Sequence, residues 1–432
     1  MTNTYETYKD SNVAWLDKIP CNWSIEKGKH VLRVLSKPVQ ETDEVITCFR
    51  DGEVILRRER RTDGFTMSDK EIGYQHIDMG DLVIHGMDGF AGSMGISKST
   101  GKGSPVLIVC NPIKDDPNYL MYYLRILAST NVFLALSTGI RERSCDLKWN
   151  KISVLPFSIP TVEEQISISS FLDTKCGEID SLVSLQQEMI NELQAYKQSV
   201  ITEAVTKGLY PHVKFKDTGV EWIGEIPEHW EMPRLKNAYT LHGRIGWNGL
   251  RSDEFKEESY AYLVTGQDFK SAEVEWSKCY QIEKERYEED PFIQLRNGDI
   301  LVTKDGTIGK IAKVSNLDKP ACLNSGIFVM RSYKNIHYQG YLYWLLVSPL
   351  LVKFNNYVNL GGTTIIHLYQ NVFERMPLVV PPMEEQVEIS KYLDSKVSQI
   401  DSLISLKQEK IDELKEYKKS IIYEYVTGKK RV

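Results

Sequence analysis

The sequence PTVEEQISISSFLDTKCGEIDSLVSLQQEMINELQAYKQSVITEAVT occupies residues 160–206 and returns at residues 381–427 as PPMEEQVEISKYLDSKVSQIDSLISLKQEKIDELKEYKKSIIYEYVT. The two copies are identical at 27 of 47 aligned positions. Neither copy contains a proline beyond its first two residues, and each begins with a Glu-Glu pair that suits the positive end of a helix dipole. The repeat therefore predicts two long, related helices.

Apolar residues shared by the two copies recur in steps of 7, 4, 7, 3 and 7, which is heptad spacing. They are Leu172/Leu393, Ile179/Ile400, Val183/Ile404, Ile190/Ile411, Leu193/Leu414 and Val200/Ile421. A helix of about 45 residues is roughly 70 Å long, and one with a single apolar seam needs a partner. We expect an antiparallel intramolecular pair. Two alternatives are that each helix covers its own domain or that the helices dimerise between chains.

A second, shorter repeat precedes each variable segment. YKDSNVAWLDKIPCNW at 8–23 aligns with FKDTGVEWIGEIPEHW at 215–230. GDLVI at 80–84 parallels GDILV at 298–302, and both patterns predict a short buried strand next to a glycine turn.

These repeats predict an α+β fold with an internal pseudo-two-fold repeat. Two mixed α/β domains, at 1–159 and 210–380, are joined by two long antiparallel coiled-coil helices at 160–209 and 381–432.

Composition places the chain among ordinary globular proteins, with 432 residues, 42% hydrophobic and 26% charged. We expect a cytoplasmic protein, because no signal-peptide pattern begins the sequence and no apolar run approaches the roughly 20 residues of a membrane span. The seven cysteines stand singly, without a C-x-x-C pair, which argues against disulfides and a zinc site. The net charge of −6 permits DNA binding without arguing for it, since the two variable segments are each close to neutral.

The motifs resemble those of the specificity (S) subunits of type I restriction–modification systems. The resemblance is carried by DSNVAWLDKIP and DTGVEWIGEIPEHW, by the helix starts IPTVEEQ and VPPMEEQ, and by the EAVTKGL exit at 203–209. It spans essentially the whole chain. One departure is DSN, where the family usually has Asp, then Ser or Thr, then Gly.

The resemblance implies two target recognition domains, each of which reads one half of a split DNA site. It also implies that the helices set the spacer and bind two modification subunits, which methylate adenine with S-adenosylmethionine. Restriction subunits that use ATP and Mg²⁺ join that core. This chain is then expected to carry no cofactor, metal or catalytic residue of its own.

Motifs for independent catalysis are missing from the sequence. Neither NPI at 111–113 nor VPPM at 380–383 matches the [N/D/S]-P-P-[Y/F/W] loop of amino-methyltransferases, and no Walker A motif occurs. Two other hypotheses stay open beside the specificity subunit. One is a self-contained methyltransferase or nuclease, and the other is a coiled-coil scaffold whose domains bind proteins instead of DNA.

Candidate DNA-binding residues are those able to reach base edges or phosphates from loops, although any one of them could be an ordinary solvated surface residue. In the first domain they are Arg57, Arg58, Arg60, Arg61, Lys98, Lys102, Arg141 and Arg143. In the second they are Arg244, Asn248, Arg251, Lys304, Lys310, Thr363 and Thr364. Because the two domains have diverged, we expect an asymmetric bipartite target whose half-site centres lie about one helical turn, roughly 10 bp, apart.

Overall fold

The computed structural model describes residues 4–60, 72–136, 146–244, 249–270, 272–334, 336–358 and 367–432. The chain forms two compact units. Unit 1 comprises Met1–Gln187 together with Gln408–Val432, and unit 2 comprises Glu188–Lys407. Each unit therefore contains one α+β domain and a part of both long helices. None of the helices in the described ranges is long and apolar enough to cross a membrane.

The domain of unit 1 is built around a four-stranded antiparallel sheet in the order β4–β11–β8–β9. Its strands are β4 Leu32–Val34, β11 Leu107–Pro112, β8 Leu82–His85 and β9 Met94–Ile96. Four two-stranded antiparallel pairs surround it: the hairpins β1 Tyr8–Val13 with β2 Leu16–Pro20 and β5 Ile46–Cys48 with β6 Val54–Leu56, and the long-range pairs β3 Ser24–Lys27 with β12 Pro156–Ile159 and β7 Gln75–Ile77 with β10 Gly101–Gly103. Short helices are α1 Gly28–Val31, α3 Val132–Ala135 and α4 Trp149–Ile152.

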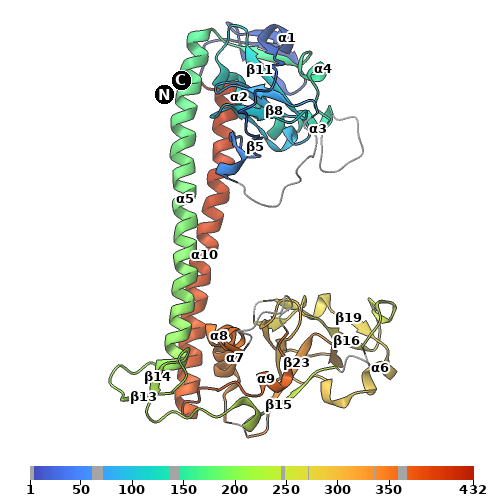
Figure 1. Ribbon diagram of the computed structural model, residues 1–432, viewed down its shortest axis with the longest axis vertical. Coiled ribbons are helices and arrows are strands. Elements are labelled where there is room, and N and C mark those ends of the chain that lie inside the picture. The colour runs from blue at the N-terminus through green and yellow to red at the C-terminus, as the bar shows by residue number, and fades with distance from the viewer. Residues whose placement is uncertain are drawn as a thin grey trace. The chain divides into compact units, whose positions relative to one another are not determined.

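Strand β8 is buried on both faces, as its uninterrupted apolar sequence predicts. Leu82 and Ile84 face helix α2 (Pro117–Ser129), whereas Val83 contacts the residues of β5 and β6 on the other side. Helix α2 begins where the Asp116 side chain accepts a hydrogen bond from the Tyr119 amide at 2.7 Å. Figure 1 shows α2, β8 and β11 together in this domain.

The domain of unit 2 has a six-stranded sheet in the order β15–β23–β20–β21–β18–β17 and a three-stranded sheet in the order β19–β16–β22. The strands are β15 Tyr239–His242, β23 Ile327–Ser332, β20 Ile300–Thr303, β21 Ile311–Lys313, β18 Glu273–Val274, β17 Phe269–Lys270, β19 Tyr280–Ile282, β16 Ala261–Val264 and β22 Ala321–Leu323. Only β16 with β22 and β18 with β21 pair in parallel among these strands. The hairpin of β13 Phe215–Asp217 and β14 Glu225–Pro227, and helices α6 Lys284–Glu288, α7 Gln339–Val347, α8 Pro349–Val358 and α9 Gln370–Phe373, complete the domain.

The glycine turns predicted before β8 and β20 are present. Gly80 and Gly298 have φ angles of 94° and 99°, a left-handed conformation that side chains other than glycine rarely adopt. The aspartate after each glycine is buried and paired with a cation. Asp81 bonds to Lys37 at 2.7 Å, and Asp299 bonds to Arg331 at 2.7 Å. The two domains thus share this turn and a cation-bound aspartate, although the cations come from different positions: Lys37 follows β4, whereas Arg331 lies in β23.

The two long helices are α5 (Val162–Lys207, 46 residues) and α10 (Met383–Val426, 44 residues). In unit 1 the Asp180 carboxylate pairs with Lys418 at 2.6 Å, and the Phe171 ring lies 4.5 Å from that of Tyr425. In unit 2 Lys197 pairs with Asp401 at 2.7 Å. Within each unit the helices therefore run in opposite directions, side by side (Figure 1). The two ion pairs occupy equivalent positions of the repeat.

Candidate nucleic-acid interface

Five of the sequence-predicted cations of the first domain gather on one surface. Arg57 and Arg58 lie in a single 3-10 turn, Arg57–Glu59, directly after β6. Arg58 pairs with Glu44 at 2.6 Å. Lys102, in β10, reaches the same residue through its backbone amide, which donates to the Glu44 carbonyl at 2.8 Å. Both side chains of the Arg58–Glu44 pair are exposed.

Glu53 joins two further candidates to this surface. Its carboxylate accepts from Lys98 at 3.0 Å and from Arg60 at 3.2 Å. Arg60 also pairs with Asp51 at 2.6 Å and lies 4.3 Å above the Phe49 ring. Burial acts to raise the pKa of Asp51, but the Glu53 amide and Arg60 outweigh it, so this pKa lies below its usual value. Exposed pairs of this kind contribute at most about 1 kcal/mol, so a phosphate can replace the carboxylate at small cost.

Arg244 is the sequence candidate that the structure places inside the protein. Its side chain is 2% exposed, its Nε donates to the Leu323 carbonyl at 3.0 Å, and a terminal nitrogen lies 3.3 Å from the Cys322 sulfur. A guanidinium held by buried groups of β22 cannot reach a base edge in this structure. We therefore correct the prediction and remove Arg244 from the candidate contacts.

The remaining described candidates of the second domain are exposed, or nearly so, on two segments. Lys304 and Lys310 flank the turn between β20 and β21, where Lys304 lies 5.2 Å from the Phe328 ring and Lys310 lies 3.4 Å from the Gly266 carbonyl. Arg251 precedes the short 3-10 turn Ser252–Glu254. The other predicted contacts lie outside the described residues, namely Arg61, Arg141, Arg143, Asn248, Thr363 and Thr364.

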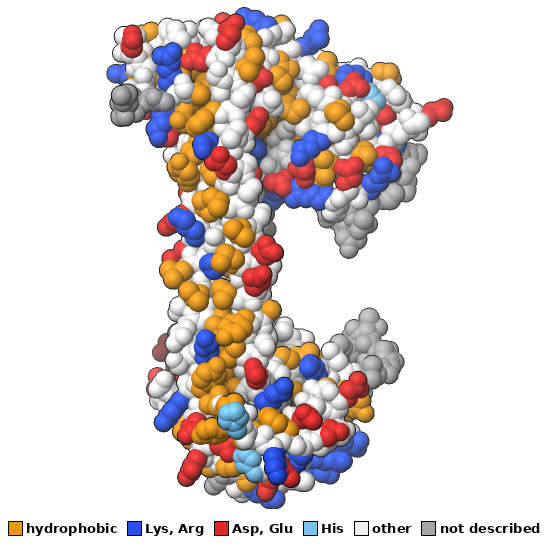
Figure 2. All heavy atoms as spheres, turned by 90° about the vertical axis from the view of Figure 1, so that its left-hand side faces the viewer, with side chains coloured by type: hydrophobic (Ala, Val, Ile, Leu, Met, Phe, Trp, Pro, Cys, Tyr) orange, Lys and Arg blue, Asp and Glu red, His pale blue; other side chains and the backbone are white. Residues whose placement is uncertain are grey.

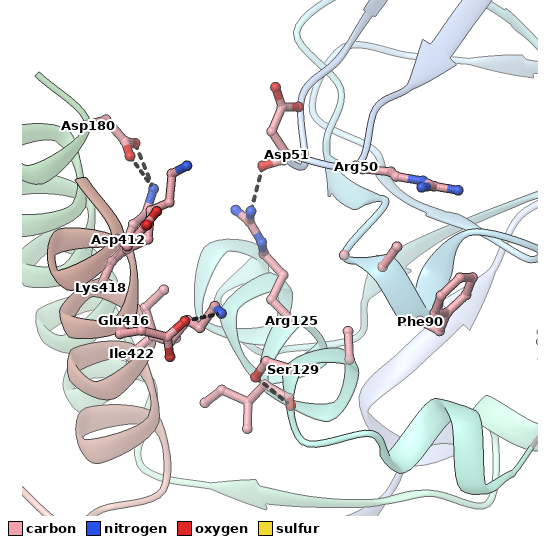
Figure 3. Close-up of a pocket in the computed structure, with 16 residues that line it drawn as sticks. Arg50, Asp51, Phe90, Arg125, Ser129, Asp180, Asp412, Glu416, Lys418 and Ile422 are labelled. Atoms are coloured by element: carbon pink, nitrogen blue, oxygen red, sulfur yellow. Dashed lines mark hydrogen bonds and ion pairs between the residues drawn. The ribbon is translucent and has the colours of Figure 1, made fainter. Parts of the chain in front are cut away.

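Sequence reasoning missed a cleft of about 630 Å³ in unit 1. Its walls come from α2, from the turn between β5 and β6, and from both long helices (Figure 3). Five cations line it together with four acidic side chains, so it is close to neutral. The cations are Arg50, Arg125, Lys415, Lys418 and Lys419. We refer to this site as the basic cleft because of its five cations, although the acidic side chains offset most of their charge.

Most charges in the basic cleft are already paired, as the dashed lines in Figure 3 show in part. Lys418 contacts Asp180, Lys419 contacts Glu416 at 2.6 Å, and Arg125 donates to the Asp51 carbonyl at 2.5 Å. These contacts hold the cations at the cleft surface. They also leave room for an anion to compete, because every pair is at least partly exposed.

The repeat itself contains the signal that identifies this cleft. Lys415 and Lys419 align with Gln194 and Gln198 of the other copy, whereas Lys418 aligns with Lys197. The fold therefore tolerates neutral residues at two of the cationic positions. The two copies therefore differ in positive charge at two positions of the same framework.

Relatives align with both copies of the repeat, whereas the family model matches a segment of the second half. Residues 228–416 match the family model described as the type I restriction modification DNA specificity domain. The MjaVIII type I restriction enzyme specificity subunit of Methanocaldococcus jannaschii is 26% identical over 444 residues, which cover 98% of this chain and 97% of that protein. The EcoBI specificity subunit of Escherichia coli is 26% identical over 338 residues, covering 75% of this chain and 68% of its own.

A solved structure shares the fold. It is a chain from work on complex assembly and conformational transition of the type I restriction–modification system, with a TM-score of 0.72 at 16% identity over 94% of this chain and 98% of that chain. The fold, the family model and the relatives agree with the duplicated motifs. The chain is thus similar to type I restriction–modification specificity subunits along nearly its whole length, and residues 228–416 match the DNA specificity domain of that family.

Proposed function

We propose that this chain is the DNA-sequence recognition subunit of a type I restriction–modification complex, in which each domain reads one half of an asymmetric bipartite site. The observation that carries the proposal is a pair of unlike domains on one repeated framework. The central sheets share the antiparallel order β4–β11–β8–β9 and β15–β23–β20–β21, and the glycine turns and helix starts recur at equivalent positions, but unit 2 adds β18 and β17 to its sheet and a separate three-stranded sheet. Two different recognition domains on equivalent helix frameworks suit a DNA target whose two half-sites differ.

The helices fit the role of a spacer in this proposal. Each is longer than 40 residues, and the equivalent ion pairs Asp180–Lys418 and Lys197–Asp401 fix the register of the helices in their own units. As one continuous antiparallel coiled coil, the helices would hold the length of the non-contacted DNA segment constant. Their heptad seam supports this reading.

In each unit, exposed apolar side chains of the long helices form a surface that is suited to bind one modification subunit. In unit 1, Leu182 and Leu185 of α5 are 47% and 49% exposed, and Tyr417 of α10 is 58% exposed. The repeat supplies the same residues in unit 2 with the helices exchanged: Leu403, Leu406 and Tyr196. We name these the unit 1 patch and the unit 2 patch. Figure 2 shows hydrophobic side chains exposed along the helices.

Two equivalent patches predict two copies of the same partner. The leucines are about half exposed, so burying the rest of each side chain contributes about 0.7–1.5 kcal/mol. In the proposed complex the partners are methyltransferase subunits that bring S-adenosylmethionine, and restriction subunits that bring ATP and Mg²⁺ join them. The chain itself recognises the DNA sequence, and it binds that DNA in the cytoplasm.

The function is tested by mapping methylated adenines across a genome with and without this chain, in cells that express the cognate modification subunit. We expect one asymmetric bipartite motif to be methylated only when the chain is present. Methylation by the chain alone would support the self-contained methyltransferase. If the modification subunit co-purified but no motif depended on the chain, the protein-binding scaffold would be favoured instead.

The basic cleft supplies a prediction about DNA affinity. Replacing Lys415 and Lys419 with the glutamines of the other copy should weaken DNA binding by the assembled complex severalfold at physiological salt. If both lysines contact phosphates, the slope of log K against log salt should fall by about 1.8, that is 0.9 for each contact. Titrations of fluorescent duplexes at several salt concentrations measure both values.

A matched control is Lys410→Gln. Lys410 is exposed on the same helix and pairs with Glu413, but it does not line the basic cleft. Lys410→Gln removes one positive charge, as each single cleft replacement does, and it should leave the slope nearly unchanged. An equal fall at both sites would show a general charge effect and would remove the cleft from the interface.

A further inference from the structure

Each recognition domain meets the helices at a junction that contains one buried tyrosine. Tyr119 is the third residue of α2, and Tyr341 is the third residue of α7. Both side chains are 0% exposed. Burial raises the pKa of both hydroxyls well above the usual value, so each keeps its proton and can donate a hydrogen bond.

The Tyr119 hydroxyl joins three elements of unit 1. It lies 2.8 Å from the Ser158 carbonyl, in the strand that leads into α5, and 3.2 Å from the Val426 carbonyl at the end of α10. The last carbonyls of a helix lack partners within the helix. The tyrosine therefore links the start of one long helix to the end of the other through its own domain.

Unit 2 repeats this arrangement with the helices exchanged. The Tyr341 hydroxyl lies 3.1 Å from the Val379 carbonyl, four residues before α10, and 3.2 Å from the Val205 carbonyl in the last turn of α5. Ser158 and Val379, and likewise Val205 and Val426, are equivalent positions of the repeat. The contact is thus preserved in two domains whose outer strands differ.

A buried glutamine strengthens each junction. The Gln165 side chain is 0% exposed, donates to Asp115 at 2.8 Å and accepts from the Asp116 amide at 2.8 Å. Gln386 is equally buried, donates to the Ile336 carbonyl at 2.8 Å and accepts from the Tyr338 amide at 2.7 Å. In both units the first turn of a long helix is thereby fixed to the segment that begins the tyrosine's helix.

We infer that Tyr119 and Tyr341 are positioning residues, whose hydroxyls set the angle at which each recognition domain leaves the helices and thereby set which DNA spacer is accepted. The inference rests on the proposed function. Apolar contacts alone are non-directional and allow small rotations. A hydroxyl held between a carbonyl at the end of one long helix and a carbonyl of the segment that leads into the other restricts such rotation, because its hydrogen bond requires a narrow distance and angle.

The test uses Tyr119→Phe, Tyr341→Phe and the double variant in the full chain with its modification subunits. Methylation is measured on duplexes that carry the cognate half-sites with the natural spacer, or with one base pair more or less. The wild-type preference for the natural spacer should fall by about tenfold in the double variant, while each half-site sequence is still required. A structural defect alone would lower all rates together and leave this ratio unchanged.

Tyr123→Phe is the matched control. Tyr123 lies one turn later in α2, is equally buried, and donates to the Pro156 carbonyl at 2.8 Å in β12, a bond that involves neither α5 nor α10. The Tyr123→Phe variant should lose about as much folding stability as the junction variants and keep the wild-type spacer preference.

The inference is overturned if the junction variants keep that preference as well, or if both fail to fold while Tyr123→Phe folds, since the hydroxyls would then be purely structural. A wild-type complex that methylates no duplex at any spacer would instead overturn the proposed function.

Discussion

Replacing Leu182 and Leu185 with aspartate should remove one of the two modification subunits from the complex. The two leucines form the α5 side of the unit 1 patch and are about half exposed in the free chain. Placing two carboxylates where about 1.5–3 kcal/mol of apolar burial is expected should weaken that association by at least about tenfold. Native mass spectrometry of the co-expressed complex should show one modification subunit per chain instead of two.

The second copy of the repeat provides the equivalent experiment on the unit 2 patch, and an exposed serine of α5 provides the control. Leu403→Asp with Leu406→Asp should remove the other subunit, and the four changes together should leave the chain alone. Ser184→Asp is exposed on the same helix, but two residues from Leu182 and so on nearly the opposite side. It should leave the stoichiometry at two, and loss of a subunit there would point to general damage to the helix.

Deleting residues 186–192 from α5 and the equivalent residues 407–413 from α10 should abolish methylation of the natural target and create a shorter one. Removing seven residues preserves the heptad seam and shortens each helix by about 10 Å, which corresponds to roughly 3 bp of DNA. The deletion spares both patches and both ion pairs that join α5 to α10. Sequencing of methylated sites should return the same half-sites around a spacer about three base pairs shorter.

Exchanging the same two segments between the helices controls for their composition. QQEMINE and KQEKIDE then change places while both helices keep their length. This exchange should leave the spacer unchanged. If the deletion variant folds, binds its modification subunits and still selects the natural spacer, the helices do not set the distance between half-sites.

The long helices and the glycine turns could be predicted because their signals are local. Heptad spacing and a shared Gly-Asp pair are visible without knowledge of distant contacts. The α+β class followed from the same patterns. The division into units could not be predicted, because it depends on α5 and α10 lying side by side, and their paired residues are more than 200 positions apart, as in Lys197 and Asp401.

The candidate interface was predictable only in part, for the same reason. The basic residues at 57–60 were visible as a cluster, but their partners Glu44 and Glu53 reach them through strand pairing. Arg244 resembled a surface loop residue until its bonds to β22, nearly 80 positions later, placed it inside. Composition cannot distinguish a solvated arginine from one that satisfies buried carbonyls.

The hydrogen bond between Tyr119 and Val426 spans 307 positions of the chain. A ribosome must therefore synthesise almost the whole protein before the first domain can complete its core, which includes Ile421 and Ile422 of α10. Long-range closure of this kind slows folding and leaves apolar surface open during synthesis. The N-terminal domain should consequently be the later of the two to mature, and nascent chains stalled before residue 408 should depend on chaperones.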